Sequence, residues 1–270
     1  MTSLARSPAP VGTLLREWRQ RRRYSQLVLA CDAGISPRHV SFVESGRARP
    51  SREMLLHLSE RLDAPLRERN LMFLAAGFAP MFKERSLDSP ELAAVREAMG
   101  LVLAAHEPYP ALAVDRHWTL VSANRGVAPL LALARPALLR TPVNVLRLSL
   151  HPAGLAPHID NLTQWRAHTF ARLGKQIEQT GDRVLMDLLT ELRAYPAGNG
   201  GMSTMEVETA SVVVPLKLRT AAGTLSFIST TMLFGTPLDV TSAELAIESF
   251  FPADAATAAA YGRPAEGGAP

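Results

Sequence analysis

The segment formed by residues 26–45 has the spacing of two short helices that cross over a tight turn. Ala30 and Gly34 follow its first residue by four and eight positions. A small residue is needed where two such helices approach, and glycine tolerates the positive φ that the turn requires. Val40 and Val43, three residues apart, give the second helix a buried side. This spacing predicts a helix-turn-helix, a motif that places its second helix in the major groove of double-stranded DNA.

The residues that begin the second helix favour the same interpretation. The Ser36 hydroxyl can cap the helix, and Pro37 fits the first helical position, where no backbone N–H is needed. Apolar periodicity on either side predicts three further helices and therefore a compact all-α domain. The five predicted helices cover residues 11–22, 25–33, 36–45, the segment that follows the capping residue Ser51, and residues 66–76.

The inward faces of the last two of these helices follow from the same periodicity. The fourth helix is predicted to bury Met54, Leu55, Leu58 and Leu62. The fifth helix is predicted to turn Leu71, Leu74 and Ala75 inward.

Beyond residue 77 the pattern changes from purely helical to mixed. Residues 111–115 and 118–122 alternate or are β-branched and aromatic, which predicts a hairpin. Two long strands are predicted over residues 206–219 and 224–235, after a flexible loop at residues 197–203. The predicted helices cover residues 90–105, 124–133, 144–150, 157–179, 182–193 and 240–250. The second part is therefore predicted to be α+β, with an antiparallel sheet of at least four strands and helices packed on one face.

Composition indicates the cellular compartment of the chain and the charge of its partners. No apolar run approaches the ~20 residues of a membrane span, and the first residues lack the apolar core of a signal peptide. The single cysteine, Cys31, excludes an internal disulfide and fits a reducing compartment, so we expect a cytoplasmic protein. Residues 1–87 carry 15 Lys and Arg against 8 Asp and Glu, a balance of +7, whereas residues 88–270 have a balance of −3. Positive charge thus surrounds the motif that would meet phosphates.

Residues 11–77 resemble the lambda-repressor-like regulators of the xenobiotic-response-element type. The resemblance rests on LREWRQRRRYSQ, LACDAGIS and SFVESGRARPS. It implies a phosphate contact from Gln26 and base contacts from the second motif helix, where Arg38 can pair with both O6 and N7 of guanine and Phe42 can meet a thymine methyl. Arg47 and Arg49 are expected at phosphates. The residues expected to bind DNA are Gln26, Ser36, Pro37, Arg38, Ser41, Phe42, Arg47 and Arg49. The family and the two-fold symmetry of operators also imply a homodimer.

Glu44 is the exception on this helix, because a carboxylate would repel phosphate. The resemblance implies an ion pair with Arg19 of the first helix instead. If that pair is buried, removing one partner should cost more than removing both. If both side chains are exposed, either change should be nearly neutral.

The remainder of the chain resembles the ligand-binding domain of MmyB-like transcription regulators. The resemblance rests on YPALAVDRHWTLVSANRG, NVLRLSLHP, NLTQWR, STTMLFGTPLDVT and ELAIESFFP, which occur in this order. It implies a PAS-like sensor, in which a sheet and helices enclose a cavity for a fatty acid or a similar apolar ligand. The expected domains are residues 11–77 for DNA binding, 78–105 for a linker and connecting helix, 106–258 for the PAS-like domain, and 259–270 for a disordered tail.

The residues expected to contact the ligand are Arg147, His151, Asn161, Trp165, Arg166 and Phe227. Arg147 or Arg166 would meet an anionic head group, but Arg147 can equally form an ion pair with a nearby carboxylate. Trp165 would form part of the cavity wall or belong to the plain core.

The sequence gives little indication of metal binding or catalysis. The histidines match no usual metal-ligand spacing and no cysteine accompanies them, so no metal site is expected. There is no Gly-x-Ser-x-Gly, phosphate-binding glycine loop or obvious pair of catalytic carboxylates, so we do not expect an enzyme. We expect a DNA-binding transcriptional regulator whose second domain senses a small, apolar or fatty-acid-like molecule. The alternative is a second domain that mediates protein interaction or dimerisation without a small ligand. The operator, the ligand and the sign of regulation stay open.

Overall fold

The computed structural model describes residues 9–196, 213–221, 223–234 and 239–262. The chain forms two compact units. The first contains the chain up to Ser86 together with the short helix α11, and the second contains most of the remainder. The two-domain organisation expected from the sequence is therefore present, and each unit is described by itself below.

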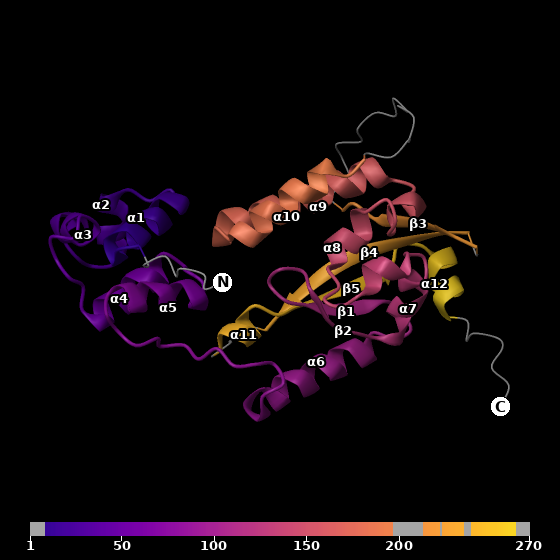
Figure 1. The fold of residues 1–270 in the computed structure, drawn as a ribbon, viewed down its shortest axis with the longest axis horizontal. Coiled ribbons are helices and arrows are strands. Elements are labelled where there is room, and N and C mark those ends of the chain that lie inside the picture. Colours follow the sequence, from indigo (N-terminus) through magenta and orange to yellow (C-terminus); the bar gives the residue numbers. More distant parts are fainter. Residues whose placement is uncertain (1–8, 197–212, 222, 235–238, 263–270) are drawn as a thin grey trace, which may run out of the picture. The chain divides into compact units, whose positions relative to one another are not determined.

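Five helices occupy the described residues of the first unit up to Ser86 (Figure 1). They are α1 (Val11–Arg21), α2 (Gln26–Asp32), α3 (Pro37–Glu44), α4 (Arg52–Arg61) and α5 (Leu66–Ala75). Three of them begin at a serine whose hydroxyl accepts a backbone N–H of the first turn: Ser25 from Val28, Ser36 from His39, and Ser51 from Met54. These bounds agree with the predicted helices to within one or two residues.

The turn between α2 and α3 has the geometry that the sequence predicts. Gly34 has a φ of 63°, and Ala30 is fully buried where the two helices approach. Val40 and Val43 face the core. One requirement was not anticipated: Gly12 of α1 lies against the end of α3, where an added Cβ would stand 2.4 Å from the Val43 carbonyl oxygen.

The inward face of α5 differs from the prediction. Leu71 and Leu74 are exposed, whereas Met72 and Phe73 are buried. Residues 71–74 are four consecutive apolar residues, so their spacing does not select one face of the helix. In the structure the Phe73 ring lies in the core and packs edge-on against Phe78, which follows the helix.

In the part of the second unit that the structure describes, five strands form one antiparallel sheet. They are β1 (Ala111–Val114), β2 (Leu120–Ala123), β3 (Leu216–Thr220), β4 (Gly223–Leu233) and β5 (Ala246–Pro252), in the spatial order β2-β1-β5-β4-β3. β1 and β2 form the predicted hairpin. Trp118 has a φ of 66° and belongs to the turn, so β2 starts two residues later than predicted.

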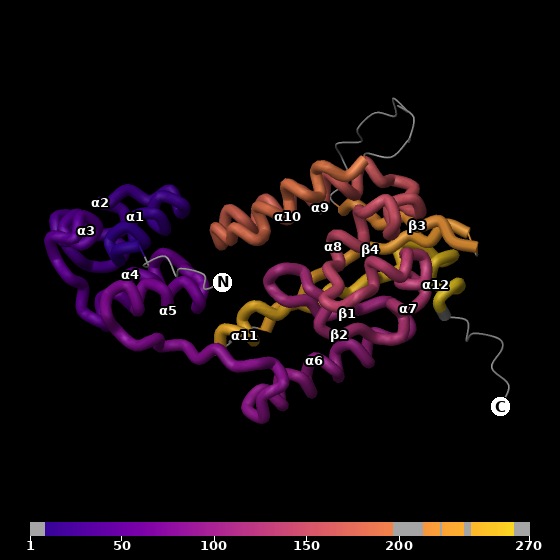
Figure 2. The backbone as a smooth tube through the Cα atoms, in the orientation of Figure 1, coloured from indigo at the N-terminus to yellow at the C-terminus, as the bar shows by residue number. Residues whose placement is uncertain are grey.

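β5 corrects the predicted helix over residues 240–250. Helix α11 (Val240–Ala243) occupies only the start of this range, and the rest is extended. The residues of ELAIESFF suit a helix by local periodicity, but β1 pairs with one edge of β5 and β4 with the other. These long-range backbone hydrogen bonds override the local preference. β5 is thus the central strand, and Figure 2 shows it beside β1, which is distant in sequence.

Helices cover both faces of the sheet, not one face as predicted. The remaining helices are α6 (Ala93–Ala105), α7 (Ala128–Leu131), α8 (Val145–Leu150), α9 (Leu162–Thr180), α10 (Arg183–Ala194) and α12 (Ala255–Gly262), with 3-10 turns at Pro90–Leu92, Arg125–Val127, Pro136–Leu139 and Ala156–His158. Met99 and Leu103 of α6 pack on Ala111, Ala113 and Ile247. The opposite face carries the larger core, which receives leucines from α8, α9 and α10. α9 begins five residues later than the predicted helix, after Asn161.

The C-terminal segment also differs from the prediction. Helix α12 continues to Gly262, so residues 259–262 are helical and do not belong to a disordered tail. α12 is attached to β4: the buried Thr257 hydroxyl accepts the Ser226 N–H at 2.9 Å. The Tyr261 hydroxyl donates to the Gly126 carbonyl at 3.1 Å. The predicted loop at residues 197–203 and the first half of the predicted strand over residues 206–219 lie outside the described residues.

Candidate functional sites

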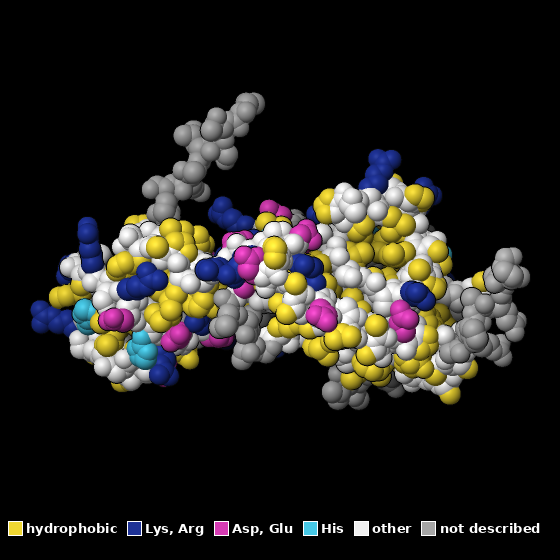
Figure 3. Space-filling view, turned by 90° about the horizontal axis from the view of Figure 1, so that it is seen from below, with side chains coloured by type: hydrophobic (Ala, Val, Ile, Leu, Met, Phe, Trp, Pro, Cys, Tyr) yellow, Lys and Arg dark blue, Asp and Glu magenta, His cyan; other side chains and the backbone are white. Residues whose placement is uncertain are grey.

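The outer side of α3 presents arginines around one aromatic ring. Two guanidinium groups lie near the Phe42 ring: that of Arg38 is 5.1 Å from the ring centroid, and that of Arg47 is 5.9 Å from it. Arg38, Arg47 and Arg49 are exposed, and Phe42 is half-buried. Stacking on the ring restricts both guanidinium groups while leaving their N–H edges directed to solvent. Figure 3 shows Lys and Arg side chains projecting from the unit that α1–α5 form.

The other residues that are expected to contact DNA differ in their exposure. Ser36 and Pro37 are exposed at the first turn of α3, where the Ser36 hydroxyl is engaged as the helix cap. Ser41 is half-buried on the same helix as Arg38. The structure thus places seven of the eight expected DNA contacts on α3 or within the few residues that flank it. The eighth, Gln26, begins α2.

A buried carboxylate ties α1, α2 and α3 together. Arg19 Nε donates to Glu44 Oε1 at 2.6 Å, and Arg19 Nη2 donates to Oε2 at 2.9 Å. Gln26 Nε2 donates to the same Oε2 at 2.8 Å, and Arg16 Nε lies 3.5 Å from it. The Glu44 side chain is completely buried. Gln26 therefore contributes to the Glu44 network in addition to its expected place at a phosphate.

The pKa of Glu44 reflects this environment. Burial acts to raise it, but the hydrogen bonds from Arg19 and Gln26 and the charges of Arg19 and Arg16 together hold the pKa below its usual value. The carboxylate is therefore ionised wherever the domain is folded near neutral pH. Glu44 serves to orient α3, which leaves the arginines of the outer face to meet an anion.

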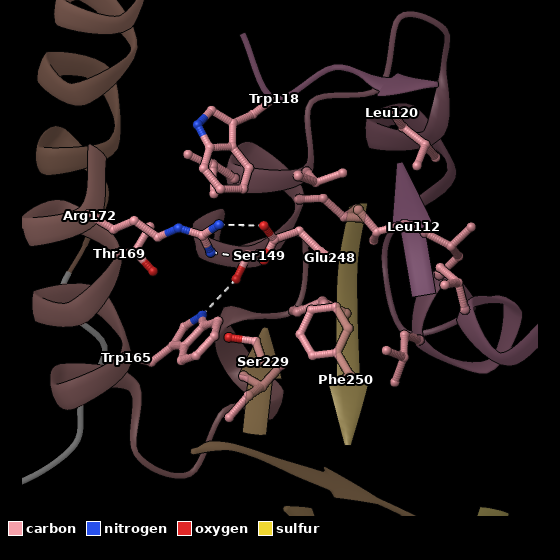
Figure 4. Close-up of a pocket in the computed structure, with 18 of the residues that line it drawn as sticks. Leu112, Trp118, Leu120, Ser149, Trp165, Thr169, Arg172, Ser229, Glu248 and Phe250 are labelled. Carbon is pink, nitrogen blue, oxygen red and sulfur yellow. Dashed lines mark hydrogen bonds and ion pairs between the residues drawn. The ribbon is translucent and has the colours of Figure 1, made fainter. Parts of the chain in front are cut away.

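The second unit contains a cavity of about 90 Å³ between the sheet and helices α7, α8 and α9 (Figure 4). Its wall is mostly aliphatic and aromatic. The residues that line it are Leu112, Trp118, Leu120, Val127, Leu130, Leu131, Val145, Leu146, Leu148, Ser149, Leu155, Trp165, His168, Thr169, Arg172, Leu216, Ser229, Glu248 and Phe250. Every strand of the sheet contributes at least one residue, so the cavity is a property of the whole fold.

One ion pair crosses the wall of this cavity. Arg172 of α9 donates from Nη1 to Glu248 Oε2 at 2.8 Å and from Nη2 to Glu248 Oε1. Arg172 Nη2 also donates to the Thr231 hydroxyl at 2.5 Å, and its guanidinium lies 4.6 Å from the Trp118 ring centroid. Glu248 is 3% exposed. Figure 4 shows Arg172 reaching from α9 to Glu248 on the central strand β5.

Hydroxyl groups gather beside Trp165. The Trp165 Nε1–H donates to the Ser149 hydroxyl at 2.9 Å. Thr169, one turn after Trp165 on α9, and Ser229 of β4 also face the cavity. Figure 4 shows Ser149 and Ser229 on the Trp165 side of the cavity, with Leu112 and Leu120 on the opposite side. The wall therefore has a polar corner and an apolar remainder.

Of the six residues expected to contact a ligand, the structure places Trp165 in the cavity wall and the other five elsewhere. Arg147 is exposed and forms a bidentate ion pair with Glu191 of α10 at 2.8 Å, the second of the two roles considered for it. His151 accepts the Ala153 N–H through Nδ1 at 2.9 Å and stabilises the turn after α8. Asn161 donates to the Pro215 carbonyl and accepts the Lys217 N–H, which fixes β3 to the start of α9.

The last two expected contacts are buried for structural reasons. Arg166 donates to the Leu192, Tyr195 and Pro196 carbonyls and so satisfies the C-terminal end of α10. Phe227 is fully buried and packs against Phe250 and Tyr261. Arg166 therefore serves the backbone of α10, and Phe227 belongs to the core of the sheet.

Sequence reasoning missed Arg172 and Glu248, the charged residues of the wall. Arg172 follows Trp165 by seven residues and His168 by four. This helical spacing places the three side chains on one side of α9, so the sequence could have indicated Arg172. Glu248 gave no such signal, because the segment that contains it was predicted to be helical. Its position in the wall depends on the pairing of β5 with β1 and β4.

The described residues contain neither a candidate membrane span nor a candidate metal site. None of their helices combines the length and apolar character of a membrane span. Within the same residues, no group of three or more His, Cys, Asp and Glu is arranged to hold a metal ion.

Comparison with known proteins adds two family matches. Residues 95–262, more than half of the chain, match the family model of the MmyB-like transcription regulator ligand binding domain. Residues 10–72 match the model of a helix-turn-helix domain. No curated protein matches the chain. The crystal structure of the clp gene regulator ClgR from Corynebacterium glutamicum is 28% identical over 36% of this chain and 90% of its own, with a TM-score of 0.22. At that TM-score the likeness carries no weight for the fold.

Proposed function

The chain belongs to the family of MmyB-like transcription regulators, and on that premise we propose that it is a DNA-binding regulator controlled by a small apolar ligand. The DNA is read by α3, and the ligand occupies the cavity beneath α8 and α9. The observation that carries the proposal is the presence, in one chain, of an arginine-bearing helix-turn-helix surface and a mostly apolar cavity.

Arg38 is the proposed base-reading residue. It is exposed in the first turn of α3, and its stacking on Phe42 limits the rotamers that it must give up on binding. A guanidinium that pairs with O6 and N7 of guanine contributes about 1–3 kcal/mol of discrimination against other bases. Arg47 and Arg49, beyond the end of α3, are proposed to contact phosphates and to add affinity without sequence preference.

The test of this assignment compares Arg38→Ala with the unaltered protein on two DNAs. The operator, selected from random duplexes by repeated binding, should lose about 10- to 100-fold in affinity, while binding to unrelated DNA should change little. Arg49→Ala serves as the matched control and should weaken both DNAs alike. Equal losses on both DNAs for Arg38→Ala would remove its base-reading role.

The regulator is proposed to bind its operator as a homodimer. A single helix-turn-helix covers one half-site, and dimers bind half-sites about 34–36 Å apart along the duplex. Analytical ultracentrifugation of the full chain with an operator duplex checks the stoichiometry. One protomer per operator at saturating protein would contradict this part of the proposal.

The ligand half of the proposal depends on the cavity. Apolar walls with a few convergent polar groups are typical of small-molecule sites. At about 90 Å³ the cavity is smaller than the apolar cavity of about 150 Å³ that accepts benzene. A long acyl chain would therefore require the wall to open, whereas a small molecule would fit after modest adjustment.

Mass spectrometry of small molecules released from the protein purified from its own host tests the ligand half. A stoichiometric apolar compound that also changes operator affinity supports the proposal. Occupancy can alter DNA binding only if the ligand binds the two DNA-affinity states unequally. A protein that carries no compound, and whose operator affinity responds to none offered, would instead favour a second domain that mediates protein interaction or dimerisation.

A further inference from the structure

The formal charges that face the cavity cancel. Among the described residues of the wall, the titratable side chains are Arg172, Glu248 and His168. Arg172 and Glu248 neutralise each other through two hydrogen bonds. Burial and the neighbouring Arg172 lower the pKa of His168, with Glu248 opposing, so its imidazole is uncharged at neutral pH. The described part of the wall therefore offers no net positive charge to a ligand.

A ligand carboxylate would meet an unfavourable interaction in either of two arrangements. With the ion pair intact, it would lie beside the buried Glu248 carboxylate, and like charges repel more strongly beside a buried group than in water. If it displaced Glu248 from Arg172, that carboxylate would stay buried without its cation, which is strongly destabilising. Arg172 is also held by the Thr231 hydroxyl and the Trp118 ring.

The polar groups that remain suit an uncharged oxygen. A hydroxyl can donate one hydrogen bond and accept two. The Ser149 hydroxyl accepts from Trp165 and keeps its own proton to donate. The Thr169 and Ser229 hydroxyls face the cavity and make no hydrogen bond to another described residue through their side chains. One oxygen of a ligand can therefore find both donors and acceptors beside Trp165.

We propose that the ligand is an uncharged molecule with a short apolar body and one hydroxyl or carbonyl oxygen, and that the Arg172–Glu248 pair excludes carboxylates. This inference rests on the proposed function, in which the cavity is the ligand site. The oxygen lies at the Ser149–Ser229 corner, and the apolar body lies toward Leu112 and Leu120. The small volume restricts the body to a few carbon atoms in the described shape.

The test uses matched alcohols and carboxylates on the full chain. The probes are n-butanol, n-hexanol and n-decanol with butanoate, hexanoate and decanoate, measured at neutral pH by thermal shift and tryptophan fluorescence. Two tryptophans, Trp118 and Trp165, line the cavity and should report occupancy. The shorter alcohols should bind saturably, and each carboxylate should bind at least about tenfold more weakly than its alcohol, because the full unit charge meets a wall of low dielectric. Carboxylates that bind as tightly as the alcohols would overturn the inference.

Glu248→Gln tests the cause of the exclusion. It keeps the shape of the side chain and leaves Arg172 without its counter-charge, so hexanoate affinity should rise at least about tenfold. The double variant Arg172→Gln with Glu248→Gln removes both charges and should bind n-hexanol as the unaltered protein does, with no gain for hexanoate. If Glu248→Gln does not fold, the comparison of alcohols and carboxylates on the unaltered protein still decides the matter.

A cavity-filling variant tests whether the probes bind in the cavity. Leu120→Trp should abolish the n-hexanol signal, whereas Leu101→Trp on the exposed side of α6 should leave it unchanged. Selective carboxylate binding that Leu120→Trp abolishes would overturn the inference and leave the ligand-controlled regulator intact. If neither series binds, nor alters operator affinity, the ligand half of the proposed function fails together with the inference, while operator binding itself is judged separately.

Discussion

Glu44 connects three helices through a single carboxylate. Arg19 reaches it from α1 and Gln26 from α2, while Glu44 itself lies at the end of α3. The orientation of α3, the helix proposed to read DNA, therefore depends on a buried carboxylate. Buried pairs of this kind stabilise little relative to apolar residues, but a remaining unpaired charge is costly.

We predict non-additive effects at this pair. Glu44→Leu leaves the Arg19 guanidinium buried and should lower the free energy of unfolding by about 3–5 kcal/mol. The double variant Arg19→Met with Glu44→Leu should be less destabilised than Glu44→Leu alone. Urea denaturation followed by circular dichroism measures both. Losses that simply add would contradict the buried-pair interpretation and indicate two independent surface charges.

The same pair predicts a pH dependence with a defined sign. The folded-state pKa of Glu44 is below its usual value of 4.5, so its contribution to stability is fully present above that value. The contribution is lost as the pH falls below 4.5 toward the folded-state pKa. The difference in unfolding free energy between the unaltered protein and Glu44→Leu should therefore be constant near neutral pH and shrink under acid conditions. A difference that grows on acidification would refute the assignment.

Gly12 allows α1 to approach the end of α3 closely. A Cβ there would stand 2.4 Å from the Val43 carbonyl oxygen and 2.7 Å from that of Glu44, both backbone atoms. Gly12→Ala should therefore separate α1 from α3 and destabilise the protein by about 1–3 kcal/mol. Gly174→Ala in α9 is the matched control, since its Cβ would meet no atom within 4 Å. It should be neutral or stabilise by about 0.5–1 kcal/mol. Similar effects of the two changes would show that the contact is not decisive.

At the scale of elements, α12 completes the sheet that the preceding strands form. The Thr257 hydroxyl accepts the buried Ser226 N–H of β4, just beyond Phe227 and Pro252, where the pairing of β4 with β5 ends. Thr257→Val keeps the shape of the side chain but leaves the N–H unsatisfied, so it should cost about 1–3 kcal/mol. Thr257→Ser keeps the hydroxyl and should cost less. Thermal denaturation of the full chain compares the two, and equal losses would assign the effect to packing alone.

The elements differ in how far the sequence predicts them. The helices of the first unit depend on local signals, namely serine caps, a glycine turn and helical periodicity, and all five were predicted. The direction of α5 was not, because residues 71–74 offer apolar side chains to every face. β5 was predicted as a helix, since its strand conformation depends on neighbours more than one hundred positions away in β1.

The same distinction separates the two candidate sites. The outer face of α3 follows from one helix and its periodicity, so its arginines could be named from the sequence. The cavity wall combines residues from five strands and several helices, and Trp165 alone among the predicted contacts lies in it. Arg147 and Arg166 were predicted to meet an anionic head group. The partners are Glu191 and backbone carbonyls, which sequence spacing does not reveal.

At the scale of the whole molecule, charge is distributed unevenly along the chain. The balance of +7 over residues 1–87 predicts DNA binding that weakens steeply with salt. Each phosphate contact adds about 0.9 to the slope of log affinity against log salt. Arg47→Gln and Arg49→Gln should each reduce that slope by about this amount. Arg140→Gln, an equal change of charge at an exposed position of the second unit, should leave it unaltered. An equal effect of Arg140→Gln would point to net charge and not to specific contacts.

Because β5 is the central strand, its displacement moves both faces of the sheet together. Glu248 faces the cavity, while its neighbour Ile247 packs on Met99 and Leu103 of α6. Adjacent residues of a strand point to opposite faces, so a displacement of β5 toward or away from an occupant is also a displacement of the floor on which α6 rests. α6 is the first long helix that the chain enters after leaving the DNA-binding unit. A change on the cavity face of the sheet is therefore expected to displace α6 on the opposite face.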